Sequence, residues 1–123
     1  MILTIGILLI VEFLPQILGT CSSRFSFGYH NCILTPTQQI KCWGYNGNGV
    51  LGYGDEIQRG DGLNEMGDYL PFVNVDGNVI SIHVGTDHSC VHLSTLEVKC
   101  WGRNAFGQLG YGDTSNRGIG LNQ

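Results

Sequence analysis

The stretch VKCWGRNAFGQLGYGD, residues 98–113, has a counterpart 58 residues earlier, IKCWGYNGNGVLGYGD, residues 40–55. The correspondence extends on both sides. At a fixed offset of 58 and without a gap, residues 27–65 match residues 85–123 at 19 of 39 positions. Self-similarity of this kind is typical of a chain built from repeated structural units. The sequence therefore contains two copies of one unit, which we call copy one and copy two.

Short apolar segments separated by turn residues indicate β-strands in copy two. Four such segments lie between Pro71 and Gly102, at residues 72–75, 79–84, 89–93 and 98–101. We expect an antiparallel meander with a tight hairpin at Asp76-Gly77, because glycine readily adopts the positive φ of such turns. Copy one supplies at most three strands between Phe25 and Trp43. No apolar stripe of helical period occurs beyond the N-terminal run, and the sequence predicts an all-β fold.

Composition narrows the classes of function. The 123 residues allow one small domain, and 42% hydrophobic residues exclude a chain that is disordered over most of its length. Six basic and ten acidic residues give a net charge of −4, and the basic residues stand singly along the chain. A nucleic-acid partner is not expected, because phosphate backbones attract clustered positive charge.

Residues 1–22 differ in character from the rest of the chain. An apolar run of about ten residues precedes the small residues 19–23, which is typical of a secretory signal peptide. No basic residue comes before the run, so an uncleaved membrane anchor and a mis-assigned start are the alternatives. We expect an extracellular or membrane-anchored protein, or an intracellular one if the start is mis-assigned. Depending on the case, Cys21 leaves with the signal, stays as a free thiol or carries a lipid.

The other four cysteines form two pairs with the same spacing of ten residues, Cys32 with Cys42 and Cys90 with Cys100. Each pair falls on two adjacent predicted strands. If the two cysteines are opposed in a non-hydrogen-bonded pair, their Cβ atoms come close enough for a disulfide. Buried free thiols are one alternative. A zinc site that also uses the nearby histidines is another, although its spacing is unlike that of structural zinc sites.

These residues resemble the regulator of chromosome condensation repeat. The motif Gly85-x-x-His88-Ser89 followed by the stretch at residues 98–113 is similar to its Gly-His-(Thr/Ser) strand and its Trp-Gly-x-Asn-x-x-Gly-Gln-Leu-Gly-x-Gly-Asp turn. Copy one departs from the pattern at Val50, where glutamine is expected. The resemblance implies part of a β-propeller of about one and a half blades. It divides the chain into a first repeat, residues 24–70, and a second, truncated repeat, residues 71–123.

The repeated signature is expected to build the scaffold and to catalyse nothing. Its glycines allow tight turns, its tryptophans supply apolar area, and its short polar residues bond backbone amides. The signature residues are Trp43, Gly44, Asn46, Gly49, Leu51, Gly52, Gly54 and Asp55 in copy one, and Trp101, Gly102, Asn104, Gly107, Gln108, Leu109, Gly110, Gly112 and Asp113 in copy two.

Function is expected outside this signature. The acidic segment from Glu56 to Leu70 is a candidate interaction loop, and its charged residues are Glu56, Arg59, Asp61, Glu65 and Asp68. A plain solvated loop, a calcium site and a site for a basic partner are the alternatives there. The tripeptide Arg59-Gly60-Asp61 needs no adhesive role, because copy two repeats its Arg-Gly. Of the histidines, His30 and His88 are expected to be buried hydrogen-bonding groups, and His83 lies on a different face.

The sequence thus predicts a protein that is not an enzyme and has no cofactor and no metal. We expect a protein-interaction segment of a secreted or surface propeller protein, with a protein partner that the sequence does not identify. A guanine nucleotide exchange factor for a small GTPase and an enzyme-inhibitory propeller are the alternatives that the resemblance implies. Further repeats or self-association are expected to cover the apolar faces, because a single repeat cannot bury its own.

Overall fold

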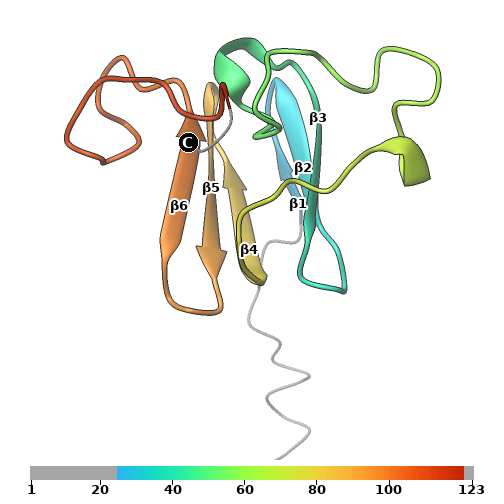
Figure 1. Ribbon diagram of the computed structural model, residues 1–123, viewed down its shortest axis with the longest axis horizontal. Helices are drawn as coiled ribbons and strands as arrows, with labels where there is room; N and C mark the ends of the chain where they lie inside the picture. Colours follow the sequence, from blue (N-terminus) through green and yellow to red (C-terminus); the bar gives the residue numbers. More distant parts are fainter. Residues whose placement is uncertain (1–24, 121–123) are drawn as a thin grey trace, which may run out of the picture.

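A computed structural model describes residues 25–120 of the chain. The predicted signal or anchor segment, residues 1–22, lies outside the described residues, as does Cys21. The described part is all-β, as predicted, with two three-stranded antiparallel sheets (Figure 1). The first sheet contains β1 (Phe25–Phe27), β2 (His30–Leu34) and β3 (Ile40–Gly44), and the second contains β4 (Val79–Val84), β5 (His88–Leu93) and β6 (Val98–Gly102). Two short 3-10 turns, η1 (Gly47–Gly49) and η2 (Gly67–Tyr69), lie in the connection between the sheets.

The two sheets repeat each other in register as well as in sequence. Cys32 is opposite Cys42 between β2 and β3, and Cys90 is opposite Cys100 between β5 and β6. The last pair of each hairpin is a histidine opposite a glycine, His30 with Gly44 and His88 with Gly102. Figure 1 shows the two hairpin turns at one end of the sheets and the turn-rich segments of both copies at the other. The duplicated sequence therefore gives duplicated structure.

The predicted meander of four strands in copy two is wrong at its first strand. Residues 72–75 form no strand of the second sheet; instead, the Val73 amide donates to the Ile40 carbonyl at 2.9 Å, on the free edge of β3. Asp76 has a φ of 52°, and the turn at Asp76-Gly77 leads the chain from the first sheet to β4. It is therefore a turn, but it does not join two paired strands. Strand pattern alone does not say which sheet edge a short segment will join.

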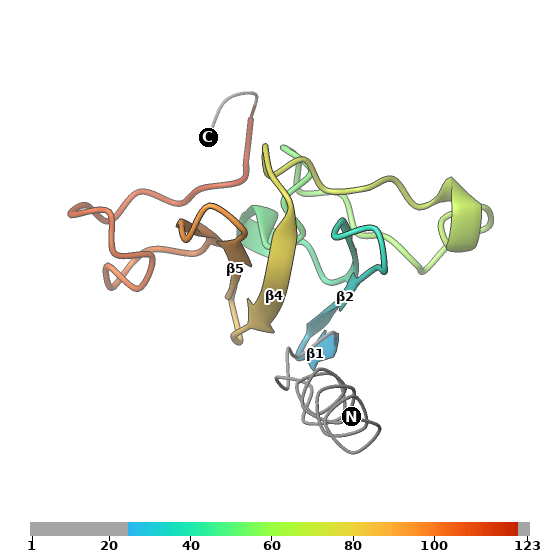
Figure 2. The same ribbon diagram turned by 90° about the horizontal axis from the view of Figure 1, so that it is seen from below.

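The core lies between the two sheets. Cys32, Leu34, Ile40 and Cys42 project from the first sheet and pack with Val79, Ile82, Val91 and Leu93 of the second sheet. Figure 2 shows β4 beside β1 and β2, so that the second sheet covers one face of the first. Alternate residues of each strand point to opposite faces, so each sheet also has a face that its neighbour does not cover. Within residues 25–120 no helix is long and apolar enough to cross a membrane.

Candidate functional site

Asn46 organises the signature turn of copy one from a fully buried position. Its side-chain amide donates to the carbonyl oxygens of Asp55 and Ile57 at 3.0 and 2.9 Å, and its Oδ1 accepts from the Leu51 amide at 2.9 Å. Asn104 makes the matching bonds in copy two, to the Asp113 carbonyl and from the Leu109 amide. Asparagine suits this position because its short amide both donates and accepts. The geometry gives these signature residues a scaffold role.

Aspartate and arginine form a second repeated contact beside this turn. Arg59 pairs with Asp55 at 2.8 Å and lies over the Tyr53 ring at 4.0 Å from its centroid. Arg117 pairs with Asp113 at 2.7 Å and lies over Tyr111. The hydrogen bond from Arg59 holds the pKa of Asp55 below its usual value. Because Arg59 is already paired and its side chain is only 17% exposed, the Arg-Gly-Asp tripeptide does not present its arginine to a partner.

The segment after the second signature returns to the first signature. The Gly120 amide donates to the Gly54 carbonyl at 2.9 Å, and the Asn116 side chain donates to Asn48 at 3.0 Å. A Cβ at Gly49, whose φ is +68°, would lie 2.6 Å from the Gly118 carbonyl carbon. Glycine at this position is therefore required both by its backbone conformation and by the close approach of copy two.

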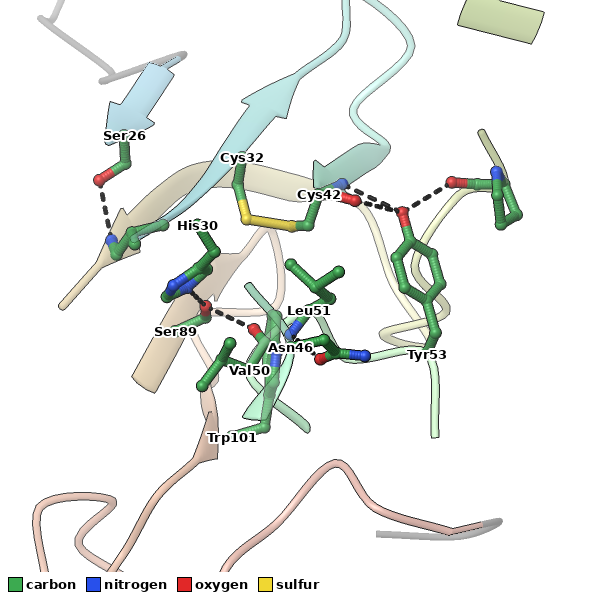
Figure 3. The surroundings of a disulfide bond; sticks show 12 residues. Ser26, His30, Cys32, Cys42, Asn46, Val50, Leu51, Tyr53, Ser89 and Trp101 are labelled. Carbon is green, nitrogen blue, oxygen red and sulfur yellow. Dashed lines mark hydrogen bonds between the residues drawn. A yellow bond between two sulfur atoms is a disulfide. The ribbon is translucent and has the colours of Figure 1, made fainter. Parts of the chain in front are cut away.

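A buried polar network joins the two sheets at His30. Its Nε2 is 2.7 Å from Ser89 Oγ, and this hydroxyl donates to the Val50 carbonyl at 2.9 Å. Trp101 Nε1 donates to the same carbonyl at 2.9 Å (Figure 3). Because Ser89 gives its only hydroxyl hydrogen to Val50, His30 Nε2 donates to Ser89, while the buried Nδ1 of His30 has no hydrogen-bond partner among the described residues. Burial disfavours the charged imidazolium and lowers the pKa of His30 to about 4.

The structure contains both predicted disulfides, Cys32–Cys42 and Cys90–Cys100. Their Cα atoms are 4.2 and 4.1 Å apart, as in non-hydrogen-bonded pairs, so the backbone groups of Cys42 point away from β2. The Tyr53 hydroxyl accepts from the Cys42 amide at 3.1 Å and lies 3.0 Å from the carbonyl oxygens of Cys42 and Pro71 (Figure 3). The Tyr111 hydroxyl bonds Cys100 in the same way.

In the interaction loop, Glu56–Leu70, the predicted charged residues do not gather into one site. Glu56 accepts from the Asn48 amide at 3.0 Å, and Arg59 belongs to the pair with Asp55. Glu65 folds back, and its Oε2 accepts from the amides of Gly60, Asp61 and Gly62 at 2.9, 3.1 and 2.8 Å. These backbone bonds lower the pKa of Glu65. Asp68 lies apart in η2, and no three side chains of the metal-binding types come together within the described residues.

The structure also places the two other histidines that the sequence singled out, His88 and His83. His88, which was expected to be buried, is only half-buried, because no sheet formed by residues 25–120 covers its face of β5. His83 is exposed on β4. The sequence interpretation missed Ser89 and the two tyrosines. The tyrosines carried a usable signal, since Tyr53 and Tyr111 are identical at the offset of 58, whereas Ser89 replaces Asn31 and carried none.

The fold and these repeated networks define the class: an all-β chain made of propeller-type repeat units. A family model described as the regulator of chromosome condensation (RCC1) repeat matches residues 79–108. The chain belongs to the RCC1 repeat family.

Two curated relatives and one solved structure illustrate the likeness. A probable E3 ubiquitin-protein ligase, HERC4 of Rattus norvegicus, is 35% identical over 91 residues, covering 72% of this chain and 8% of the ligase. The ultraviolet-B receptor UVR8 of Arabidopsis thaliana is 30% identical over 89 residues, covering 71% of this chain and 19% of the receptor. Yeast RCC1 (Prp20), solved bound to Kap60, has a similar fold, with a TM-score of 0.59 at 20% identity over 77% of this chain and 21% of Prp20. The chain thus spans a small part of each relative.

Proposed function

We propose that this chain is a non-catalytic protein-interaction segment of an extracellular or membrane-surface RCC1-repeat protein. One observation carries the proposal: both copies use their signature side chains in internal bonds, while the interaction loop exposes large apolar side chains. Ile57, Leu63 and Tyr69 are 65%, 96% and 70% exposed. Several exposed apolar side chains on one loop, beside acidic groups, suit a surface that binds a partner.

The two disulfides support the extracellular part of the proposal. Cystines persist in oxidising compartments and are rare where glutathione and thioredoxin keep thiols reduced. Protein taken from its native compartment and alkylated before reduction is expected to label no cysteine other than Cys21. Labelling of the four repeat cysteines would contradict secretion.

The role of the interaction loop is tested with the immobilised chain. The double variant Leu63→Ser, Tyr69→Ser removes two exposed apolar groups, and Leu96→Ser is the matched control on the β5–β6 turn, where Leu96 is 80% exposed. Extracellular proteins captured by the native chain are identified, and the affinity of each for the variants is measured. We expect affinity to fall about tenfold or more in the double variant and to stay unchanged in the control. Equal affinities would contradict a binding role for the loop.

A further inference from the structure

One face of the second sheet is uncovered within the described residues, although the residues at the equivalent positions of the first sheet are buried. Ile40 is fully buried under the second sheet, whereas its equivalent at the offset of 58, Val98, is 63% exposed. Cys42 is fully buried, and its equivalent Cys100 is half-buried. We call this the outer face of the second sheet: His88, Cys90, His92, Val98 and Cys100. Its apolar positions are those of an interface that has no partner within the described residues.

The first sheet has the complementary surface. Val91 and Trp101 are buried where copy two packs against copy one, at 0% and 6% exposure. Their equivalents Ile33 and Trp43 lie on the opposite face of the first sheet and are only half-buried. The outer face of the second sheet is therefore equivalent to the buried face of the first sheet, and the opposite face of the first sheet is equivalent to the buried face of the second. Each chain thus has two further surfaces that match the two sides of the contact between its own copies.

The polar groups of that contact are also duplicated. Within the chain, His30 bonds Ser89 across the sheets, and Trp101 donates to the carbonyl of Val50. At the offset of 58 the equivalent groups are His88 on the outer face, Asn31 and Trp43 on the first sheet, and the Gln108 carbonyl. An asparagine amide can replace the serine hydroxyl as the partner of a histidine, since it both donates and accepts.

The second signature turn has the space that such a contact needs. A Cβ at Gly49 would lie 2.6 Å from the backbone of Gly118, whereas at its equivalent Gly107 the nearest atom is the Asp113 carbonyl oxygen of the same turn, at 3.9 Å. A Cβ at Gly54 would lie 3.2 Å from the Gly120 carbonyl oxygen, whereas at its equivalent Gly112 nothing lies within 4 Å. The turn of copy two therefore keeps these glycines, although nothing in the described part of the chain approaches it as closely as copy two approaches the turn of copy one.

We propose that the outer face of the second sheet binds the first sheet of a second copy of this chain, head to tail. His88 meets Asn31 of that copy, and Trp43 of that copy reaches the Gln108 carbonyl. The outer face lies on the other sheet from the interaction loop, whereas the first-sheet half of the contact borders that loop, because a Cβ at Gly60 would lie 3.4 Å from the Trp43 ring. The inference goes beyond the proposed function and does not depend on it, and its test substitutes no residue of the loop.

Three hydrogen bonds of the internal contact have no equivalent in this interface: Asn116 to Asn48, the Val84 amide to Ser26, and the Gly120 amide to Gly54. The first two are lost because Phe106 and Val84 stand at the positions equivalent to Asn48 and Ser26. The Gly120 amide bonds the Gly54 carbonyl at 2.9 Å, but its equivalent in copy one, the Gly62 amide, is held by Glu65 at 2.8 Å. The contact between chains thus starts with three fewer hydrogen bonds than the contact within the chain. We expect association that is reversible and depends on concentration.

Two variants, each blocking one end of the contact, test the proposal in the full chain by sedimentation velocity. Val98→Glu puts a charge on the outer face, and Ile33→Glu puts one on the first sheet. Each variant alone is expected to be a monomer, while an equal mixture forms a one-to-one dimer, because one intact half of the contact remains on each variant. Leu96→Glu, on an exposed turn, is the control and associates like the native chain. If Ile33→Glu does not keep the native circular dichroism, Asn31→Glu takes its place.

Each result either supports or overturns head-to-tail binding between two copies of the chain. Head-to-tail binding would be overturned by a native chain that stays monomeric at every concentration measured, by a mixture that stays monomeric, or by a Val98→Glu chain that still associates. The last result would instead indicate a symmetric contact or association through another segment. Dimers formed only in the mixture would support the proposal.

Discussion

At the scale of single residues, His30 carries a pH dependence that follows from its burial. Its pKa is about 4 in the folded protein and near 6.5 when unfolded. Between these values the unfolded chain binds more protons, so the free energy of unfolding falls as the pH is lowered from about 6.5 to 4 and levels off below that range. The full loss is on the order of 3 kcal/mol.

Urea unfolding at pH 7, 5 and 4 measures this loss. His30→Gln is expected to lower stability at pH 7 but to flatten the dependence, while His83→Gln, at an exposed position on β4, keeps it. An unchanged slope in His30→Gln would mean that carboxylates alone cause the acid sensitivity.

The two tyrosines give a matched pair of substitutions. Tyr53→Phe removes the hydroxyl that bonds both backbone groups of Cys42, and we expect a loss of about 1 to 3 kcal/mol because buried backbone groups lose their partner. Tyr111→Phe is expected to cost less, since Tyr111 is 47% exposed and water can reach Cys100. Thermal unfolding of the two variants compares them, and equal losses would contradict the difference in burial.

At the scale of elements, the two disulfides differ in access. Cys32 and Cys42 are fully buried under the second sheet, whereas Cys90 and Cys100 lie on its outer face. We expect a thiol reductant to open Cys90–Cys100 first in the folded protein. Timed reduction followed by alkylation and peptide mass analysis gives the order, and simultaneous opening of both bonds would show that reduction requires global unfolding.

The hairpins β2–β3 and β5–β6 were predictable, because the alternating pattern, the turns and the cysteine spacing all act within about fifteen residues of each other. The position of residues 72–75 was not. Val73 joins the edge of β3, and that choice depends on which edge is free after the sheets have packed. The His30–Ser89 bond was equally hidden, because it joins residues 59 positions apart and the serine has no repeat in copy one. Local periodicity contains no information about contacts of that range.

At the scale of the whole molecule, the N-terminal segment is expected to be separable from the fold. The repeat correspondence begins beyond it, and every described core residue lies at Cys32 or later. Deleting residues 1–20 should leave the β signal in circular dichroism unchanged and abolish secretion. A loss of β signal in the truncated chain would mean that the segment packs as part of the core.

The return of residues 116–120 to the first signature turn also bears on how the chain folds while it is being made. The groups that complete copy one, Ser89, Gly118 and Gly120, are synthesised long after the strands that they contact. Copy one therefore emerges from the ribosome with its inner face and its turn uncovered, and it reaches its final packing only when copy two has followed. Contacts between residues so far apart in sequence make folding slow and leave apolar strands exposed meanwhile. For this chain, chaperone protection should matter most in the interval between the synthesis of β3 and that of residue 120.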